Sequence, residues 1–99
     1  MSYEMVVGLN VTNDERYTEY RAAITPILKS YGGGFRYDFK VSHVLKNEGG
    51  EAINRVFTIG FPDETTKEKF FSDPEYLVAK ERLYTSSVNA TTIIAKYSY

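Results

Sequence analysis

Two long runs of alternating apolar and polar residues, joined by a short turn, constrain the fold of this chain most. The first run extends from Phe35 to Lys46 and the second from Ile53 to Phe61. Residues 47–50 between them are rich in turn-forming residues. Alternation with a period of two is typical of a strand that buries one face. We therefore expect an antiparallel β-hairpin in the middle of the chain.

A strand and a helix are predicted before this hairpin. Residues 3–11 alternate, with Met5, Val7, Leu9 and Val11 on one side. A helix should follow, because apolar residues recur at helical spacing between positions 17 and 31. Thr12 and Glu15 have the spacing of a capping box, Pro26 should kink or divide the helix, and residues 32–34, all glycine, should end it.

Helical segments and a last strand are predicted after the hairpin. Asp63 can cap a helix over residues 64–71. Asp73, Pro74 and Glu75 then have the residue types that favour an N-cap, a first helical position and a first turn. A second helical segment should run from Pro74 to about Leu83. Residues 88–97 alternate again and predict the last strand.

The order strand, helix, strand, strand, helix, strand predicts an α+β fold of the ferredoxin-like type, as a single domain over residues 1–99. One face of the antiparallel sheet should pack against helices through Val7, Leu9, Phe39, Phe57, Ile59 and Ile93. The other face mixes Arg36 and Asp38 with Val6, Gly8, Asn10, Val56, Thr58, Gly60 and Ile94. Such a half-apolar face is a candidate for burial against a second subunit.

Composition limits the possible partners and chemistry. The chain has 99 residues, with 12 basic and 13 acidic side chains and no basic stripe, so we expect neither a nucleic acid nor a membrane as partner. It has no cysteine, which excludes disulfides and a thiolate nucleophile. No cofactor is implied. No apolar leader or membrane-spanning run occurs, so we expect a soluble cytoplasmic protein.

Candidate site residues are few. His43 is the only histidine and the one candidate for general acid–base catalysis, although its alternation in the strand favours a structural or edge position. No metal site is predicted around one histidine. Glycines in central strands often mark a close approach of a ligand. We therefore expect open space at Gly8 and Gly60, and the predicted ligand pocket consists of Asn10, Arg36, Asp38, Asn54, Thr58 and Gly60. The alternative for Arg36 and Asp38 is an exposed ion pair.

The chain also resembles a known family. The resemblance rests on Tyr17, Tyr20, Pro26, residues 31–33, Leu45, residues 55–62 with the letters RVFTIGFP, residues 70–76 with the letters FFSDPEY, and Arg82. It is similar to domain-of-unknown-function family 1330. The resemblance implies a dimeric α+β barrel, in which two ferredoxin-like subunits pack sheet against sheet around a cavity. The chain departs from the family pattern at three positions. Members usually carry glutamate where this chain has Lys46 and Gly60, and glycine where it has Asn47.

Three functions remain open from the sequence. The first is a homodimer that binds a small organic molecule in the barrel cavity. The second is a non-catalytic structural or protein-interaction module. The third is a cofactor-free monooxygenase-like or isomerase-like enzyme. Whether the chain is an enzyme is left open.

Overall fold

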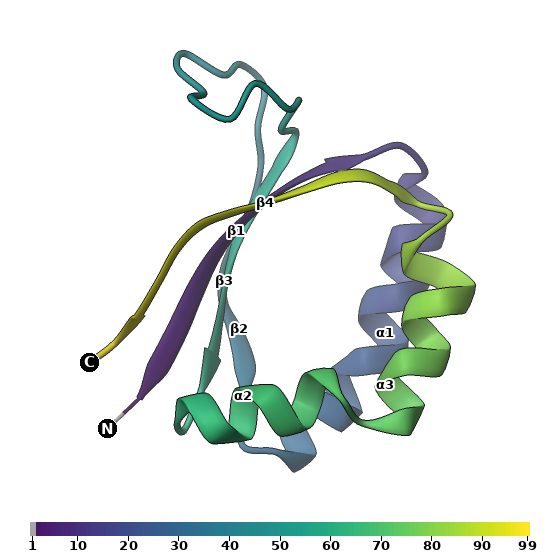
Figure 1. Ribbon diagram of the computed structural model, residues 1–99. Coiled ribbons are helices and arrows are strands. Elements are labelled where there is room, and N and C mark those ends of the chain that lie inside the picture. The colour runs from purple at the N-terminus through teal and green to yellow at the C-terminus, as the bar shows by residue number, and fades with distance from the viewer. Residues whose placement is uncertain (1) are drawn as a thin grey trace.

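The fold is a four-stranded antiparallel sheet with helices on one of its faces (Figure 1). The structure is a computed structural model that describes residues 2–99. Its elements are β1 (Tyr3–Val11), α1 (Asp14–Ser30), β2 (Gly34–Lys40), β3 (Arg55–Phe61), α2 (Glu64–Phe71), α3 (Pro74–Ala79), the π-helical turn η1 (Lys80–Tyr84) and β4 (Val88–Ser98). The strand order is β2-β3-β1-β4. This order and the helix placement confirm the predicted ferredoxin-like fold.

The first helix differs from the prediction in its cap, and it is not divided in its middle. The N-cap is Asn13, whose side-chain oxygen accepts a hydrogen bond from Arg16 N at 3.0 Å. The predicted capping box of Thr12 and Glu15 is therefore wrong, because Asn13 already supplies the acceptor. α1 continues through Pro26 as one helix. It ends at Ser30, and Gly32, just past the C-cap Tyr31, has the left-handed conformation expected of a glycine cap, with a φ of 76°.

The second helical region begins as predicted and ends differently. Asp63 and Asp73 cap α2 and α3, and the Asp73 carboxylate accepts from Glu75 N at 2.8 Å. The Asp73 carboxylate also accepts from the Tyr31 hydroxyl at 2.6 Å, which ties α3 to the end of α1. The segment that was expected to be one helix to about Leu83 instead widens into η1 after Ala79.

The core lies between the helices and the face of the sheet that they cover, called the inner face here. It includes Tyr3, Val7, Leu9, Phe57 and Ile59 from the sheet and Tyr17, Ile24, Leu28, Phe70 and Tyr76 from the helices. Odd-numbered residues of β1 and β3 point inward, as the alternation predicts. None of the helices in residues 2–99 lies on the opposite face, which is called the outer face (Figure 1).

A β-bulge in β2 exchanges the two faces. The register with β3 shifts by one residue between Phe35 and Tyr37, so Arg36 is an extra residue. Every later residue of the strand then points to the opposite side. Asp38 therefore lies on the inner face, while Tyr37 and Phe39 stack on the outer face with ring centroids 6.4 Å apart. The predicted outward position of Asp38 and inward position of Phe39 are wrong, because simple alternation contains no bulge.

A second bulge affects β4. Its register with β1 shifts between Val6 and Val7, which makes Ile94 the extra residue. Ile93 faces inward as predicted. Tyr97, at the same parity, instead bonds to Glu4 on the outer face.

The connection from β2 to β3 is a loop over residues 41–54 that extends past the end of the sheet (Figure 1). The predicted first hairpin strand is thus too long, because β2 ends at Lys40. His43 and Leu45 lie in this loop and are exposed. Asn54 anchors its end, since its side chain accepts from Val11 N and donates to Val11 O, both at 2.8 Å. Within residues 2–99, no helix has both the length and the apolar character needed to cross a membrane.

Candidate functional site

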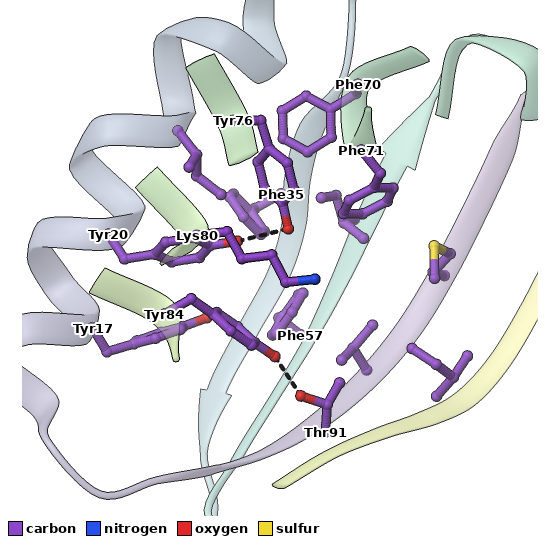
Figure 2. A pocket seen from close by; sticks show the side chains of 15 residues that line it. Tyr17, Tyr20, Phe35, Phe57, Phe70, Phe71, Tyr76, Lys80, Tyr84 and Thr91 are labelled. Carbon is purple, nitrogen blue, oxygen red and sulfur yellow. Dashed lines mark hydrogen bonds between the residues drawn. The ribbon is translucent and has the colours of Figure 1, made fainter. Parts of the chain in front are cut away.

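A cavity of about 370 Å³ lies between the inner face and the helices. Figure 2 shows the fifteen side chains that line it, which come from every strand and every helical segment. This inner cavity is lined by Met5, Val7, Tyr17, Tyr20, Ile24, Phe35, Phe57, Ile59, Phe70, Phe71, Tyr76, Lys80, Tyr84, Thr91 and Ile93. Its volume is within the range of small-molecule pockets, toward the lower end.

The walls of the inner cavity are mainly aromatic and hold one another in place. Tyr20 of α1 contacts Tyr84 of η1 with ring centroids 5.0 Å apart. Phe71 of α2 meets Tyr76 edge to face at 5.3 Å. Tilted and edge-to-face pairs of this kind are favourable beyond the area that they bury. The cavity therefore has a rigid apolar wall on its helical side.

Two pairs of hydroxyls interrupt the apolar lining. The Tyr20 hydroxyl bonds to the Tyr76 hydroxyl at 3.2 Å, and the Tyr84 hydroxyl bonds to Thr91 Oγ1 (Figure 2). Burial raises the pKa of Tyr20, Tyr76 and Tyr84 above the ordinary value, because it disfavours the charged phenolate. At neutral pH these phenols are therefore uncharged and keep their protons.

Lys80 is the one charged residue among the fifteen that line the inner cavity. Its side chain extends from the start of η1 into the cavity, between the two hydroxyl pairs (Figure 2). The residue as a whole is exposed, which places its ammonium at the mouth. Among residues 2–99, no carboxylate forms a salt bridge with it.

The π-helical turn explains why Tyr76, Lys80 and Tyr84 all line the cavity. In an α-helix, residues four apart drift around the axis by about 40°. In η1 the helix widens, and Thr85 N donates to Lys80 O at 3.1 Å across five residues. The wider turn offsets the drift, so these positions stay on one side. π-turns of this kind are frequent at functional sites.

None of the predicted pocket residues lines the inner cavity. Arg36 and Gly60 instead border a shallower hollow beside residues 32–34 and Tyr99. Arg36 Nη1 donates to Glu4 at 2.8 Å and to the Tyr99 hydroxyl at 2.6 Å. Glu4 is only 4% exposed and also accepts from Tyr97. The Arg36 guanidinium is therefore bonded to groups of its own subunit. Its predicted partner Asp38 lies on the other face of the sheet.

Asp38 belongs to a cluster of ion pairs at the edge of the inner face. Its carboxylate accepts two hydrogen bonds from Arg55, both at 2.8 Å, and two longer ones from Arg21 at 3.3 and 3.5 Å. Arg21 also lies over the Phe35 ring, 3.8 Å from its centroid. Hydrogen bonds from Arg55 lower the pKa of Asp38 below its usual value. The cluster is satisfied internally and closes the cavity wall behind Phe35.

The other predicted pocket residues also have partners in the subunit. The Asn54 side chain bonds to Asn10 at 3.3 Å, and Thr58 Oγ1 accepts from Tyr37 N at 3.0 Å. The open space expected at the two strand glycines is filled. A Cβ at Gly8 would lie 2.9 Å from Ile53, and one at Gly60 would lie 3.3 Å from Arg36.

The residues that do form the cavity were not identified from the sequence. Tyr76, Lys80 and Tyr84 recur every four positions, but this spacing is also that of an ordinary buried helix stripe. The available signal was the tyrosine content, nine of 99 residues, because tyrosine combines an apolar body with a polar tip. A lysine within a row of tyrosines is the feature that distinguishes this stripe from a plain core.

A family model described as a domain of unknown function, DUF1330, matches residues 3–97. The chain belongs to this family. The match confirms the resemblance noted from the sequence. No curated protein was found to be similar to the chain.

Several solved structures have a similar fold at low sequence identity. A protein of unknown function from Rhodopseudomonas palustris has a TM-score of 0.82 at 17% identity, over 97% of this chain and 80% of that one. A dabb-family protein with a ferredoxin-like fold from Mesorhizobium loti has a TM-score of 0.70 at 13% identity, over 99% and 96%. A dimeric ferredoxin-like protein of unknown function from Thermobifida fusca has a TM-score of 0.66 at 7% identity, over 100% and 92%.

Proposed function

We propose that this chain is a small-molecule-binding protein whose ligand occupies the inner cavity. The observation that carries the proposal is the combination of an apolar, largely aromatic wall with a few convergent polar groups, Lys80 and the two hydroxyl pairs. Binding pockets typically combine an apolar lining with a small number of placed polar groups. A packed core has no comparable space, because interiors are normally filled to crystal-like density.

The test is a thermal-shift screen of the purified protein with small aromatic and aliphatic acids, alcohols and amines. A ligand at a hundredfold excess over its Kd stabilises the folded state by about 2.7 kcal/mol. Ile93→Trp places a large ring at the mouth of the cavity and should abolish the shift. Leu77→Trp, on an exposed helix position outside the cavity, should preserve it. A shift that survives Ile93→Trp would place the ligand elsewhere and contradict the proposal.

We also propose that the outer face forms a homodimer. Large apolar side chains there are between 41% and 57% exposed, namely Tyr37, Phe39, Tyr97 and Tyr99. Exposed apolar patches of this extent mark protein interfaces. Dimers described for similar folds, including the Thermobifida fusca protein, support a second copy as the partner.

Light scattering at micromolar concentration tests the dimer. The unmodified chain should have twice the monomer mass. Phe39→Asp should shift it toward the monomer, because a buried unpaired carboxylate is costly. Leu77→Asp introduces the same charge on the helical side and should leave the mass unchanged. A monomer mass for the unmodified chain would contradict the proposal.

A further inference from the structure

The charge of the inner cavity indicates the charge of its ligand. Lys80 supplies one positive charge, and the described residues place no carboxylate among the cavity lining. The neighbouring phenols stay neutral, as burial raises the pKa of Tyr76 and Tyr84. A cationic ligand would therefore meet a like charge without a compensating group. An anion would pair with Lys80 in surroundings where charge pairs are stronger than in water.

The hydrogen-bonding groups of the cavity point to the same conclusion. Each hydroxyl has one proton to donate. The hydrogen bond between Tyr20 and Tyr76 takes up one of the pair's two protons and leaves the other for a ligand. The pair of Tyr84 and Thr91 likewise leaves one. Lys80 adds up to three N–H donors. The hydroxyl pairs and the Lys80 ammonium thus leave several donor protons free within one site, which suits a group that only accepts, such as a carboxylate with its two oxygens.

The shape of the wall indicates the rest of the ligand. Rings of Phe35 and Phe57 meet edge to face at 5.4 Å on the sheet side of the cavity, and Tyr20 and Tyr84 lie on the helix side. Aromatic rings prefer offset-stacked or edge-to-face contact with other rings. A volume of about 370 Å³ favours a molecule of one or two rings.

Resting on the proposed function, we infer that the ligand is a small planar aromatic carboxylate. Its ring lies among the phenylalanine and tyrosine side chains of the inner cavity. Its carboxylate is held at the mouth by the Lys80 ammonium and by the free protons of the two hydroxyl pairs. The widened turn η1 serves this site, because it keeps Tyr76, Lys80 and Tyr84 on one side of the helical segment.

The test compares probes that share a ring and differ in charge. Calorimetric titration would use 2-naphthoate, 2-naphthalenemethanol and 2-naphthylmethylammonium, and then the corresponding benzoate, benzyl alcohol and benzylammonium. The carboxylate of at least one series should bind about 10- to 100-fold more tightly than the alcohol, as expected for hydrogen bonds to a charged group. The ammonium compound should bind more weakly than the alcohol.

Variants of Lys80 test the residue assignment. Lys80→Met should reduce carboxylate affinity to that of the alcohol and leave alcohol affinity unchanged, whereas Lys80→Arg should retain most of the preference. Lys69→Met removes another exposed charge, from α2 and outside the cavity, and should change neither affinity. Equal affinity for alcohol and carboxylate, or a preference that survives Lys80→Met, overturns this inference and leaves the proposed function standing. Failure of all six compounds to bind overturns this inference, and the proposed function is overturned with it when the aliphatic compounds of the thermal-shift screen also fail to bind.

Discussion

The two faces of the same sheet present different surfaces, although their residues alternate along the same strands. The inner face encloses a cavity with one ammonium group and no described carboxylate in its lining. The outer face is open and apolar, and its charged groups, Glu4 and Arg36, are paired with each other. An enclosed space with an unpaired charge suits a small molecule, whereas an open face with satisfied charges suits a second protein surface. The two proposals thus assign a different partner to each face of the sheet, although the residues of the two faces are one position apart.

The largest expected difference between the faces is in stability. Phe70 is fully buried beside the inner cavity, and Phe39 is 57% exposed on the outer face. Phe70→Ala should lower the free energy of unfolding by about 3–5 kcal/mol at any protein concentration, because it leaves a void among packed rings. Phe39→Ala should lower the free energy of unfolding by an amount that grows with protein concentration, since the substitution weakens the proposed dimer. Urea denaturation at two protein concentrations distinguishes the two variants. If the loss of unfolding free energy depended on protein concentration equally in both, the two faces would not differ in this way.

A smaller effect is expected from the caps of the helices. Asp73→Ala removes the acceptor for Glu75 N and the partner of Tyr31, and should cost about 1 kcal/mol of unfolding free energy. It should also weaken ligand binding, because α3 leads into the segment that carries Lys80 and Tyr84. Asp63→Ala removes the cap of α2, which contributes only Phe70 and Phe71 to the cavity. Asp63→Ala should lower the free energy of unfolding by a similar amount and leave the ligand affinity almost unchanged. If both variants lost the same ligand affinity, this role of α3 would be contradicted.

The smallest effect concerns pH. Hydrogen bonds from Arg55 lower the pKa of Asp38 in the folded state, so its contribution to stability is present above the unfolded-state pKa, near 3.9, and is lost as the pH falls below that. Asp38→Asn should cost about 1 kcal/mol or less at pH 7, because the pair is partly exposed. In denaturation experiments at pH 7, 5 and 3, the difference in unfolding free energy between Asp38→Asn and the unmodified chain should become smaller only at pH 3. A constant difference would contradict the assignment, and Glu19→Gln, at an exposed helix position, is the control.

The elements of the fold were predictable where local chemistry decides them. The limits of β1 and α2, the caps Asp63 and Asp73, and the left-handed conformation of Gly32 all follow from residue type and spacing. These features depend on neighbours in the sequence. A single strand or cap can therefore be identified without knowledge of the rest of the chain.

The site was not predictable because it depends on departures from regular geometry. The bulge at Arg36 leaves no mark in the alternation, yet it moves Asp38 to the inner face and Phe39 to the outer one. The widening at η1 also cannot be recognised in the sequence, since Tyr76, Lys80 and Tyr84 fit a regular helix stripe. Glycines at positions 8 and 60 suggested space, but Ile53 and Arg36, placed by tertiary packing, fill it.

The most direct test of a ligand site on the inner face is a ¹H–¹⁵N correlation spectrum of the protein titrated with 2-naphthoate. We predict that the perturbed amides cluster in residues 76–84 and around Thr91 and Ile93, while those of Tyr37 and Phe39 on the outer face stay unchanged. Perturbations centred on the outer face, or on the hollow beside Arg36 and Gly60, would contradict the account.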